Sequence, residues 1–441
     1  MTIEEIHSLY LQCSGRVTTD SRAVRGGEMF IALKGENFDG NSYALKSLEA
    51  GAAFALVDEG TEAAASGDAR VIAVPDTFQT LKDLACWHRN HTFVDGRRLT
   101  VIGLTGTNGK TTTKELIRAV LAAKYRVTAT EGNLNNDIGV PLSLLKINSD
   151  TELAVIEMGA NHPDDIARLV TVSQPDYGLI TNVGKAHLLG FGSFEGVKAA
   201  KGCLYDYIAA HEGQAFINAD DDDLVGMAEE RQGMSLIPYG IAYDHATVLA
   251  STPEEPFLKI RLGHRIVKTR LVGAYNATNV LAALAVGKQF GVPVEDAVRA
   301  ISEYTPANSR SQMMRTERNV LIADAYNANP SSMNAALDNF SSMEAPFKIA
   351  LLGDMRELGA DSLREHVAIM TRACAMGCRV CLVGEEFHKA MAEAPEAASA
   401  AEWFPDSQAL AAELREHPVT GATILVKGSR GIRMETAIPE L

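Results

Sequence analysis

The sequence predicts an α/β protein of three domains: a small α/β domain over residues 1–80, a central parallel-sheet domain over 81–309 and a Rossmann-like domain over 310–441. The chain has 441 residues, more than one hydrophobic core usually serves. Apolar runs alternate with helical segments through the central range, which is typical of a parallel sheet. A second alternating stretch follows Thr305–Ser309, whose composition is that of a hinge.

Each domain is predicted from short apolar runs that read as strands. In the first range, the strands are expected around one helix, Ala44–Ala50. The central strands are expected at 99–104, 153–157 and 178–182, with a helical pattern from Lys114 to Leu121. The strands expected in the other two domains are Met29–Leu33, Phe54–Val57 and Val71–Val74 in the first range, and Val320–Ala323, Ile349–Leu352, Val380–Val383 and Ile424–Val426 in the last.

A glycine-rich turn joins the first central strand to its helix and predicts a phosphate-binding loop. Backbone N–H groups in such a turn approach phosphate oxygens at the positive end of the helix. Lys110 is expected to neutralise the β- and γ-phosphates of ATP or GTP, and the Thr111 hydroxyl to reach Mg²⁺. The residues expected to bind the nucleotide here are Gly106, Thr107, Asn108, Gly109, Lys110, Thr111 and Thr112.

The match is to a short form of the phosphate-loop pattern. Leu104 stands where the common pattern has its first glycine, so the loop is Gly106-Thr-Asn-Gly109-Lys-Thr. The alternative interpretation is a chance glycine-rich turn between a strand and a helix.

Two further polar residues follow central strands, where ligands bind in doubly wound sheets. Glu157 ends one strand and would hold the Mg²⁺ that Thr111 touches; a surface charge at a strand end is the alternative. His187 follows the next strand and is a second predicted metal ligand, although a lone histidine is more often structural.

Composition limits the partners. The chain has 41 Lys and Arg against 56 Asp and Glu, a formal net charge of −15, which argues against nucleic acid or an acidic membrane. No apolar stretch reaches the roughly 18 residues that a membrane span needs, and no signal peptide is visible. Three of the six cysteines, Cys374, Cys378 and Cys381, cluster in the sequence, and they are expected to be buried free thiols rather than a metal site. A cytoplasmic protein is expected.

Several strings along almost the whole chain resemble those of the Mur ligase family. They are Thr105–Thr111, Asn135–Pro141, Glu157–Asn161, Asn182–His187, Gly273–Asn279, Asp324–Pro330, Leu352–Gly359 and Val426–Arg430. The phosphate loop and the Glu/His elements are shared by the superfamily. The strings Asp324-Ala-Tyr-Asn-Ala-Asn-Pro330 and Leu352-Gly-Asp-Met-Arg-Glu-Leu-Gly359 resemble the member that acts last in its series. Lys185 is a small departure from the family pattern.

The resemblance assigns roles that the residues alone do not. Lys201 matches a carbamoylated lysine that would complete a metal site beside His187; taken alone it is a solvated helical lysine. Asn276 and Asn279 match the adenine-contacting segment, and alone they are a helix N-cap and a first-turn polar residue. Arg310 and Asp324 match positions that reach the phosphates and the ribose; alone, Arg310 is a linker charge. Lys110, His187, Lys201 and Arg310 are the implied catalytic residues.

The resemblance also implies residues that bind the other substrates. Ser21 and Arg22, in a string that is otherwise simply a turn, match a module that binds UDP. Asn136 is assigned to substrate in the same way. Lys427 and Ser429 match the region that receives the incoming dipeptide, where cations and hydroxyls suit a carboxylate.

The reaction implied by the resemblance is ATP-dependent amide formation between UDP-N-acetylmuramoyl-tripeptide and D-alanyl-D-alanine through an acyl phosphate. Two Mg²⁺ ions, a carbamoylated Lys201 and a monomeric enzyme are expected. The alternatives are another member of the superfamily (a tripeptide-forming ligase or folylpolyglutamate synthetase), a phosphate-loop kinase or switch, and a non-enzymatic nucleotide-binding protein.

Overall fold

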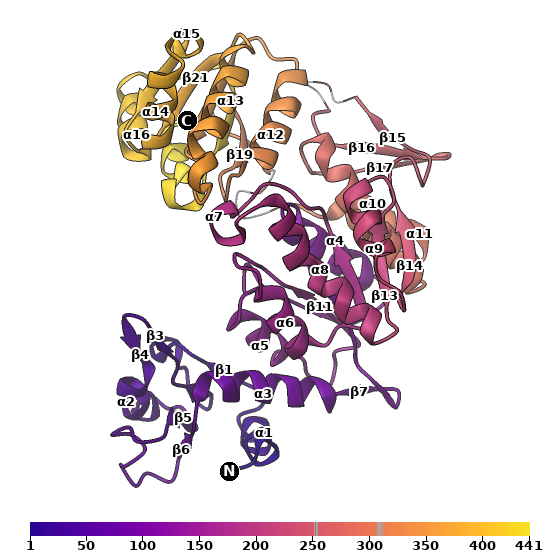
Figure 1. Cartoon of the computed structure of the whole chain (residues 1–441), viewed down its shortest axis with the longest axis vertical. Helices are drawn as coiled ribbons and strands as arrows, with labels where there is room; N and C mark the ends of the chain where they lie inside the picture. Colours follow the sequence, from indigo (N-terminus) through magenta and orange to yellow (C-terminus); the bar gives the residue numbers. More distant parts are fainter. Residues whose placement is uncertain (251, 253–254, 307–309, 311) are drawn as a thin grey trace.

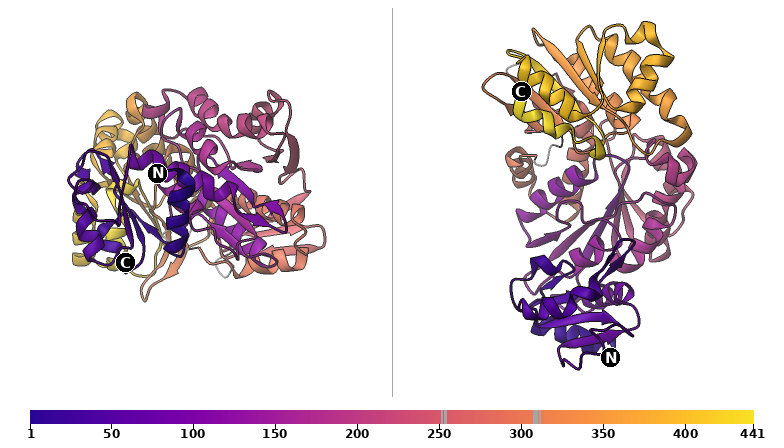
Figure 2. Two further views of the ribbon diagram at one scale, coloured as in Figure 1. Left: turned by 90° about the horizontal axis from the view of Figure 1, so that it is seen from below. Right: turned by 90° about the vertical axis from the view of Figure 1, so that its left-hand side faces the viewer.

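The computed structural model describes residues 1–250, 252, 255–306, 310 and 312–441. Three layered α/β units follow one another along the long axis of the molecule, with the amino-terminal unit at one end and the carboxyl-terminal unit at the other (Figures 1 and 2). Residues 307–309 of the predicted hinge, next to the predicted boundary at 309 and 310, lie outside the described residues.

The amino-terminal unit contains a parallel sheet in the order β1-β2-β5-β6. The three predicted strands and the predicted helix are present. Helix α1 was not predicted, and it begins with a capping box in which Thr2 and Glu5 satisfy each other's backbone N–H groups. The elements are α1 (Ile3–Gln12), β1 (Val17–Thr18), β2 (Met29–Ile31), β3 (Lys34–Gly35), β4 (Phe38–Asp39), α2 (Ala44–Glu49), β5 (Phe54–Asp58) and β6 (Val71–Val74).

Helix α3 (Thr77–Asn90) connects this unit to the central one and packs against helices of both. Its partners are α1 on one side and α5 (Gly139–Leu144) and α6 (Asp165–Ser173) on the other. Leu81, Leu84 and Ala85 are fully buried in a hydrophobic cluster that continues into the central unit. The domain boundary predicted at residues 80 and 81 falls inside this helix and stays a prediction.

The central unit is built on a parallel sheet in the order β10-β11-β9-β12-β13-β14. All three predicted strands belong to it. The third ends at Ile180, so Asn182 lies beyond the strand and contacts the glycine-rich loop instead. The elements are β9 (Thr100–Thr105), α4 (Lys110–Ala122), β10 (Val127–Ala129), β11 (Leu153–Glu157), β12 (Tyr177–Ile180), α7 (Leu188–Phe191), α8 (Phe194–Ala210), β13 (Gln214–Asn218), α9 (Asp222–Glu229) and β14 (Ser235–Tyr239).

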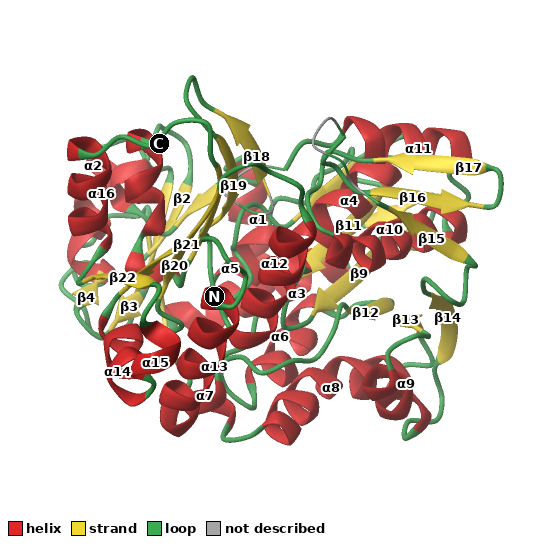
Figure 3. Ribbon diagram, turned by 90° about the horizontal axis from the view of Figure 1, so that it is seen from above, coloured by secondary structure: helices red, strands yellow, loops and turns green. Residues whose placement is uncertain are grey.

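Small antiparallel sheets interrupt the parallel pattern expected over 81–309. Strands β15 (Ala246–Leu249), β16 (Lys259–Leu262) and β17 (Arg265–Lys268) form one at the side of the unit (Figure 3). A short hairpin, β7 (Phe93–Val94) with β8 (Arg97–Arg98), precedes β9. Helices α10 (Ala277–Gln289) and α11 (Val294–Glu303) complete the unit by packing on α4.

The carboxyl-terminal unit has a sheet in the order β18-β19-β23-β20-β21-β22, parallel except for its edge strand β18. All four predicted strands are present. Asp324 and Lys427 are paired at the carboxyl ends of β19 and β23. The elements are β18 (Gln312–Arg315), β19 (Val320–Asp324), α12 (Pro330–Ser342), β20 (Lys348–Gly353), α13 (Ser362–Cys374), β21 (Arg379–Val383), α14 (Glu385–Glu393), α15 (Pro395–Ala398), β22 (Ala401–Phe404), α16 (Ser407–Glu416) and β23 (Thr423–Lys427).

None of the helices formed by the described residues is long and apolar enough to cross a membrane. All six cysteines are free thiols. Cys13 and Cys381 are buried, whereas the other four are only half-buried.

Candidate functional site

A cleft of about 740 Å³ opens between the central and carboxyl-terminal units. It brings together most of the residues singled out from the sequence, including residues from both sides of the predicted hinge. The predicted residues that line it are Thr107, Asn108, Gly109, Lys110, Thr112, Asn136, Glu157, His187, Asn276, Asn279, Arg310, Asp324 and Lys427. Gly106, Thr111, Lys201, Ser429, Ser21 and Arg22 do not line it.

The glycine-rich loop between β9 and α4 requires glycine at two positions. Gly106 has φ +147° and Gly109 has φ +78°, both in the region that side chains rarely adopt. A Cβ on Gly106 would lie 1.9 Å from the Thr181 hydroxyl, and one on Gly109 would lie 2.7 Å from the side chain of Asn279. The loop is therefore packed tightly between β12 and α10.

The loop is held from the end of β12. Asn182 accepts hydrogen bonds from the backbone N–H of Thr107 at 3.0 Å and of Asn108 at 3.0 Å. Since these two amides are engaged, the first amides of α4, which have no partner within the helix, are the donors that the geometry offers to a phosphate.

Lys110 starts helix α4 and turns its ammonium onto the loop. Its Nζ donates to the carbonyl oxygens of Gly106 at 2.7 Å and of Thr107 at 3.1 Å. Burial lowers the pKa of Lys110, an effect opposed by Glu157 and increased by Arg310. A nearby anion would act against this effect and raise the pKa of Lys110.

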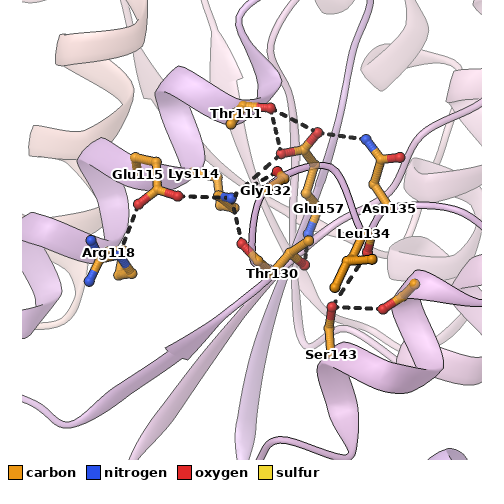
Figure 4. Close-up of polar contacts among 11 residues, drawn as sticks. Thr111, Lys114, Glu115, Arg118, Thr130, Gly132, Leu134, Asn135, Ser143 and Glu157 are labelled. Carbon is orange, nitrogen blue, oxygen red and sulfur yellow. Dashed lines mark hydrogen bonds and ion pairs between the residues drawn. The ribbon is translucent and has the colours of Figure 1, made fainter. Parts of the chain in front are cut away.

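Glu157, at the end of β11, is 1% exposed and is surrounded by donors (Figure 4). The Thr111 hydroxyl lies 2.9 Å and 3.2 Å from its two carboxylate oxygens. The Asn135 side chain donates to Oε1 at 2.7 Å. On the other side, Lys114 Nζ lies 4.0 Å from Oε2. A hydroxyl and a carboxylate this close offer two oxygen ligands of the kind that Mg²⁺ prefers.

His187 lies beyond β12, at the junction with the carboxyl-terminal unit, and has a left-handed backbone with φ 52°. Its Nδ1 is paired with the carboxylate of Glu357, a residue of the string Leu352–Gly359. Burial lowers the pKa of His187; Glu357 opposes this effect, and the charges of Lys110 and Lys201 add to it.

Lys201 lies in the middle of α8 and is 2% exposed. This burial contradicts the interpretation of Lys201 as a solvated helical lysine. Within the described part of the chain its ammonium makes no hydrogen bond or ion pair, and it lies 5.7 Å from the centre of the Phe191 ring. The pKa of Lys201 is lowered well below its ordinary value by burial and by the charge of Lys110. The neutral amine is thereby favoured.

Asn276 and Asn279 join the loop to α10. Asn276 precedes the helix but makes no capping bond with its side chain, which donates instead to the Val272 carbonyl at 2.8 Å. Asn279 donates to Asn276 at 2.9 Å and accepts a bond from the Thr113 hydroxyl at 3.0 Å. Both side chains are fixed before any ligand arrives.

The carboxyl-terminal unit presents cations to the same cleft. The Arg310 guanidinium lies 3.5 Å from the centre of the Tyr326 ring. The Lys427 ammonium is bound to Asp324 at 2.5 Å and is 1% exposed. Asn329, at the start of α12, hydrogen bonds with Asn108 of the loop at 2.8 Å, so the two units are in direct contact.

Ser429 and the Ser21–Arg22 pair lie outside this arrangement. Ser429 is buried, and its hydroxyl donates to the Ala328 carbonyl at 3.2 Å and accepts from the Arg356 amide at 2.9 Å. Arg22 is exposed and folds back on Asp20, which also caps the short turn through the Arg22 amide. The string around Ser21 and Arg22 thus forms a turn, as expected if it has no binding role.

The sequence analysis did not single out Lys114, Asn135, Tyr326 or Glu357. A signal was available for Lys114, because it shares a helical face with Ile117 and Leu121, which are both fully buried. Asn135, Tyr326 and Glu357 all lie within the strings that carry the family resemblance. Glu357 is 170 positions from His187, so no local pattern could have paired them.

The fold and the cleft define a nucleotide-binding α/β protein, and comparison with known proteins gives the family. The model described as "Mur ligase family, catalytic domain" matches residues 15–89, "Mur ligase middle domain" matches 104–287 and "Mur ligase, glutamate ligase domain" matches 309–430. The chain belongs to the Mur ligase family.

Individual relatives are similar over almost the whole chain. The UDP-N-acetylmuramoyl-tripeptide–D-alanyl-D-alanine ligase of Escherichia coli (strain K12) is 35% identical over 437 residues, covering 96% of this chain and 93% of the relative. The protein of the same name from Bacillus subtilis (strain 168) is 34% identical over 436 residues, covering 96% and 92%.

Solved structures are similar over the same extent. A crystal structure of MurF from Acinetobacter baumannii has a TM-score of 0.83 and 30% identity, covering 97% of this chain and 93% of that one. MurF ligase from Thermotoga maritima in complex with ADP has a TM-score of 0.80 and 26% identity, covering 97% of both chains. The predicted three-domain α/β fold class is confirmed.

Proposed function

We propose that this chain is an ATP-dependent ligase that joins D-alanyl-D-alanine to UDP-N-acetylmuramoyl-tripeptide, forming a C–N bond, ADP and phosphate, in the synthesis of peptidoglycan precursors. The full-length relatives at 35% and 34% identity carry this activity in their names. The structural observation that carries the proposal is a single cleft that holds the phosphate loop, Glu157 and the cations of the carboxyl-terminal unit.

The cleft suits a reaction that begins with attack of a carboxylate on the γ-phosphate of ATP. Two anions must approach each other, and Lys110 and Arg310 both line the space in which they would meet. The resulting acyl phosphate has a good leaving group, so the amine of the dipeptide can attack its carbonyl and expel phosphate. Lys427, also at the cleft, is proposed to hold the carboxylate of the dipeptide.

The residues present fit one Mg²⁺ at the phosphate loop. Thr111 and Glu157 supply oxygen ligands 2.9 Å apart beside the amides that would face the phosphates. A bound Mg²⁺ would neutralise phosphate charge there. The proposed nucleotide contacts are Gly106 to Thr112 of the loop, Asn276 and Asn279 near adenine, Arg310 at the phosphates and Asp324 at the ribose.

A second Mg²⁺ is proposed between His187 and Lys201. Lys201 is buried without an anionic partner among the described residues, and burial favours its neutral amine. A neutral amine can add CO₂ and release a proton to solvent, which gives a carbamate, an anionic oxygen ligand. Whether His187 and Lys201 can hold Mg²⁺ therefore depends on that modification.

The remaining assignments are proposed on the family resemblance. Residues 1–80 would bind the UDP-sugar, 81–309 ATP, and 310–441 would complete the ligase site. Ser21 and Arg22 would contact UDP, Asn136 the substrate peptide and Ser429 the dipeptide site. A cytoplasmic monomer is proposed as the working form.

Mass spectrometry of the products from ATP, UDP-N-acetylmuramoyl-tripeptide and D-alanyl-D-alanine tests the proposal. A new amide product, with ADP and phosphate released only when both acceptor and donor are present, is expected. A phosphorylated stable product would instead identify a kinase. Amide formation only with a free amino acid or with glutamate would identify another type of ligase.

A further inference from the structure

Lys114 is a lysine buried in the interior of α4, one turn beyond Lys110. Its side chain is 0% exposed, and it does not line the cleft. Burying an ammonium costs free energy unless its charge is paired and its N–H groups are hydrogen bonded. The contacts that offset this cost show what the residue does.

Figure 4 shows those contacts, with Lys114 lying between Glu115 on one side and Glu157 on the other. The Lys114 ammonium donates to the Thr130 carbonyl at 2.5 Å and pairs with Glu115 at 2.9 Å. It lies 4.0 Å from Oε2 of Glu157. Within the described residues, Lys114 is the one cationic side chain whose nitrogen comes this close to the Glu157 carboxylate.

Lys114 also acts on Glu157 through the segment 130–135. The Thr130 hydroxyl accepts a hydrogen bond from the Glu157 amide at 3.0 Å, and Asn135 donates to Oε1 at 2.7 Å. Lys114 holds the first part of this segment by the Thr130 carbonyl and, at 3.5 Å, the Gly132 carbonyl. The Glu157 carboxylate thus lies between Lys114 on one side and the Asn135 side chain on the other, and Thr130 holds the Glu157 backbone.

We propose that Lys114 is a positioning residue for Glu157. It holds the buried carboxylate in place and aimed at the Thr111 hydroxyl, and it thereby sets the affinity of the phosphate-loop metal position without touching ATP. This inference rests on the proposed function, because it takes Glu157 as a ligand of the divalent ion.

The test measures the affinity of the protein for Mn²⁺ by electron paramagnetic resonance, in the presence of a non-hydrolysable ATP analogue. Lys114→Met should weaken Mn²⁺ binding at the phosphate-loop position about 10- to 100-fold, which is the usual cost of removing a residue that orients a metal ligand. The KM for Mg·ATP should rise by a similar factor, and saturating Mg²⁺ should restore most of kcat.

Lys124→Met is the matched control. Lys124 follows the same helix, and its ammonium likewise donates to two carbonyls, those of Phe290 at 3.1 Å and Gly291 at 3.0 Å. Lys124 has no contact with Glu157 among the described residues, so the Mn²⁺ affinity of the Lys124→Met protein should stay within about twofold of wild type. Equal effects of Lys114→Met and Lys124→Met would overturn the inference.

Two more variants separate the role of Lys114 at Glu157 from folding. Lys114→Gln keeps a side-chain donor but loses the contact of the ammonium with Glu157, so the carboxylate is held by fewer groups and Mn²⁺ binding should still weaken. A folded Lys114→Gln protein with wild-type affinity contradicts the proposal. Glu115→Gln removes the other anionic partner and leaves Lys114 beside Glu157, so it should bind Mn²⁺ as wild type does.

Glu157→Gln distinguishes failure of the inference from failure of the proposed function. If Glu157→Gln leaves Mn²⁺ affinity unchanged, Glu157 is not a metal ligand, and that part of the proposed function fails. If Glu157→Gln weakens binding and Lys114→Met does not, only the role of Lys114 fails.

Discussion

Two regions beside the cleft carry the predicted metal ligands, a first corner at Glu157 and a second corner at Lys201, and they differ in how far the protein satisfies their charges. At the first corner, Glu157 is buried among a hydroxyl, an amide and an ammonium. At the second, Lys201 is equally buried but has no anionic partner among the described residues. The first corner is complete in the protein alone, whereas the second is complete only if an anion is added to it.

The same difference separates the two buried lysines, Lys114 and Lys201. Lys114 is paired with Glu115 at 2.9 Å, and its burial is offset by that charge. The pKa of Lys201 is lowered by burial and by Lys110. A neutral amine is the form that reacts with CO₂, so the unsatisfied corner is chemically suited to the carbamate that the family resemblance implies.

The largest effect is expected for Lys110, whose charge reaches both corners. Lys110→Ala should reduce amide formation about 10²–10³-fold, because loss of one preorganised charge-stabilising group costs about 2.7–4 kcal/mol in the transition state. The melting temperature should change little, since the ammonium contacts only loop carbonyls. Steady-state kinetics with Lys124→Ala as control tests this; a folded Lys110→Ala enzyme of normal activity would contradict the phosphate-loop assignment.

Lys201→Ala probes the second corner alone. Activity should fall about 10²-fold, since the proposed carbamate ligand is lost. Millimolar formate or another short acid should restore part of it by supplying an anion in the vacated space. Lys198→Ala is the control one turn earlier on α8, where the lysine pairs with Asp223 at 3.1 Å, and it should remain active. A fully active Lys201→Ala enzyme removes the carbamate from the account.

Lys201→Met should stabilise the fold while it impairs activity. In CO₂-depleted buffer, the buried amine of Lys201 has no charged partner among the described residues, and an apolar side chain of similar length avoids its desolvation. Thermal unfolding should therefore show a melting temperature a few degrees above wild type. The paired Lys198→Met should not gain stability. A lower melting temperature for Lys201→Met would mean that Lys201 is satisfied by contacts that stabilise the fold.

A histidine pair far from the cleft provides the smallest test, because both rings have hydrogen-bond partners without any added group, with His88 buried and His7 half-buried. His88 Nε2 bonds to the Ile147 carbonyl at 2.8 Å and therefore carries the proton, so His7 Nε2 donates to His88 Nδ1 at 3.1 Å. Burial and the charges of His88 and His91 lower the pKa of His7 from 6.5 to about 4.

The unfolded chain therefore binds protons more readily than the folded one between these two values. Stability should be complete above pH 6.5 and should fall as the pH decreases toward 4. Denaturant unfolding should show a shallower pH dependence for His7→Gln than for wild type. Identical pH dependence in the two proteins would show that the pair does not titrate in this range.

How much of this could be predicted from the sequence depends on the range of the interaction. The strand end fixed the position of Glu157, because an apolar run and the residue after it are local features, whereas Asp324 was singled out only by the family resemblance. The antiparallel strands β15–β17 were missed, since their alternation lies within a range that otherwise reads as parallel α/β. The contact of His187 with Glu357 and that of Asn108 with Asn329 join residues from different units, which no local pattern encodes.

The central claim, one complete and one incomplete metal corner, is tested most directly by counting Mn²⁺ ions per chain with a non-hydrolysable ATP analogue. With bicarbonate present, two ions are expected for the wild-type protein. One is expected for Lys201→Ala, and one for the wild-type protein in CO₂-depleted buffer. Two ions bound with unchanged affinity by Lys201→Ala, with or without bicarbonate, would contradict the account.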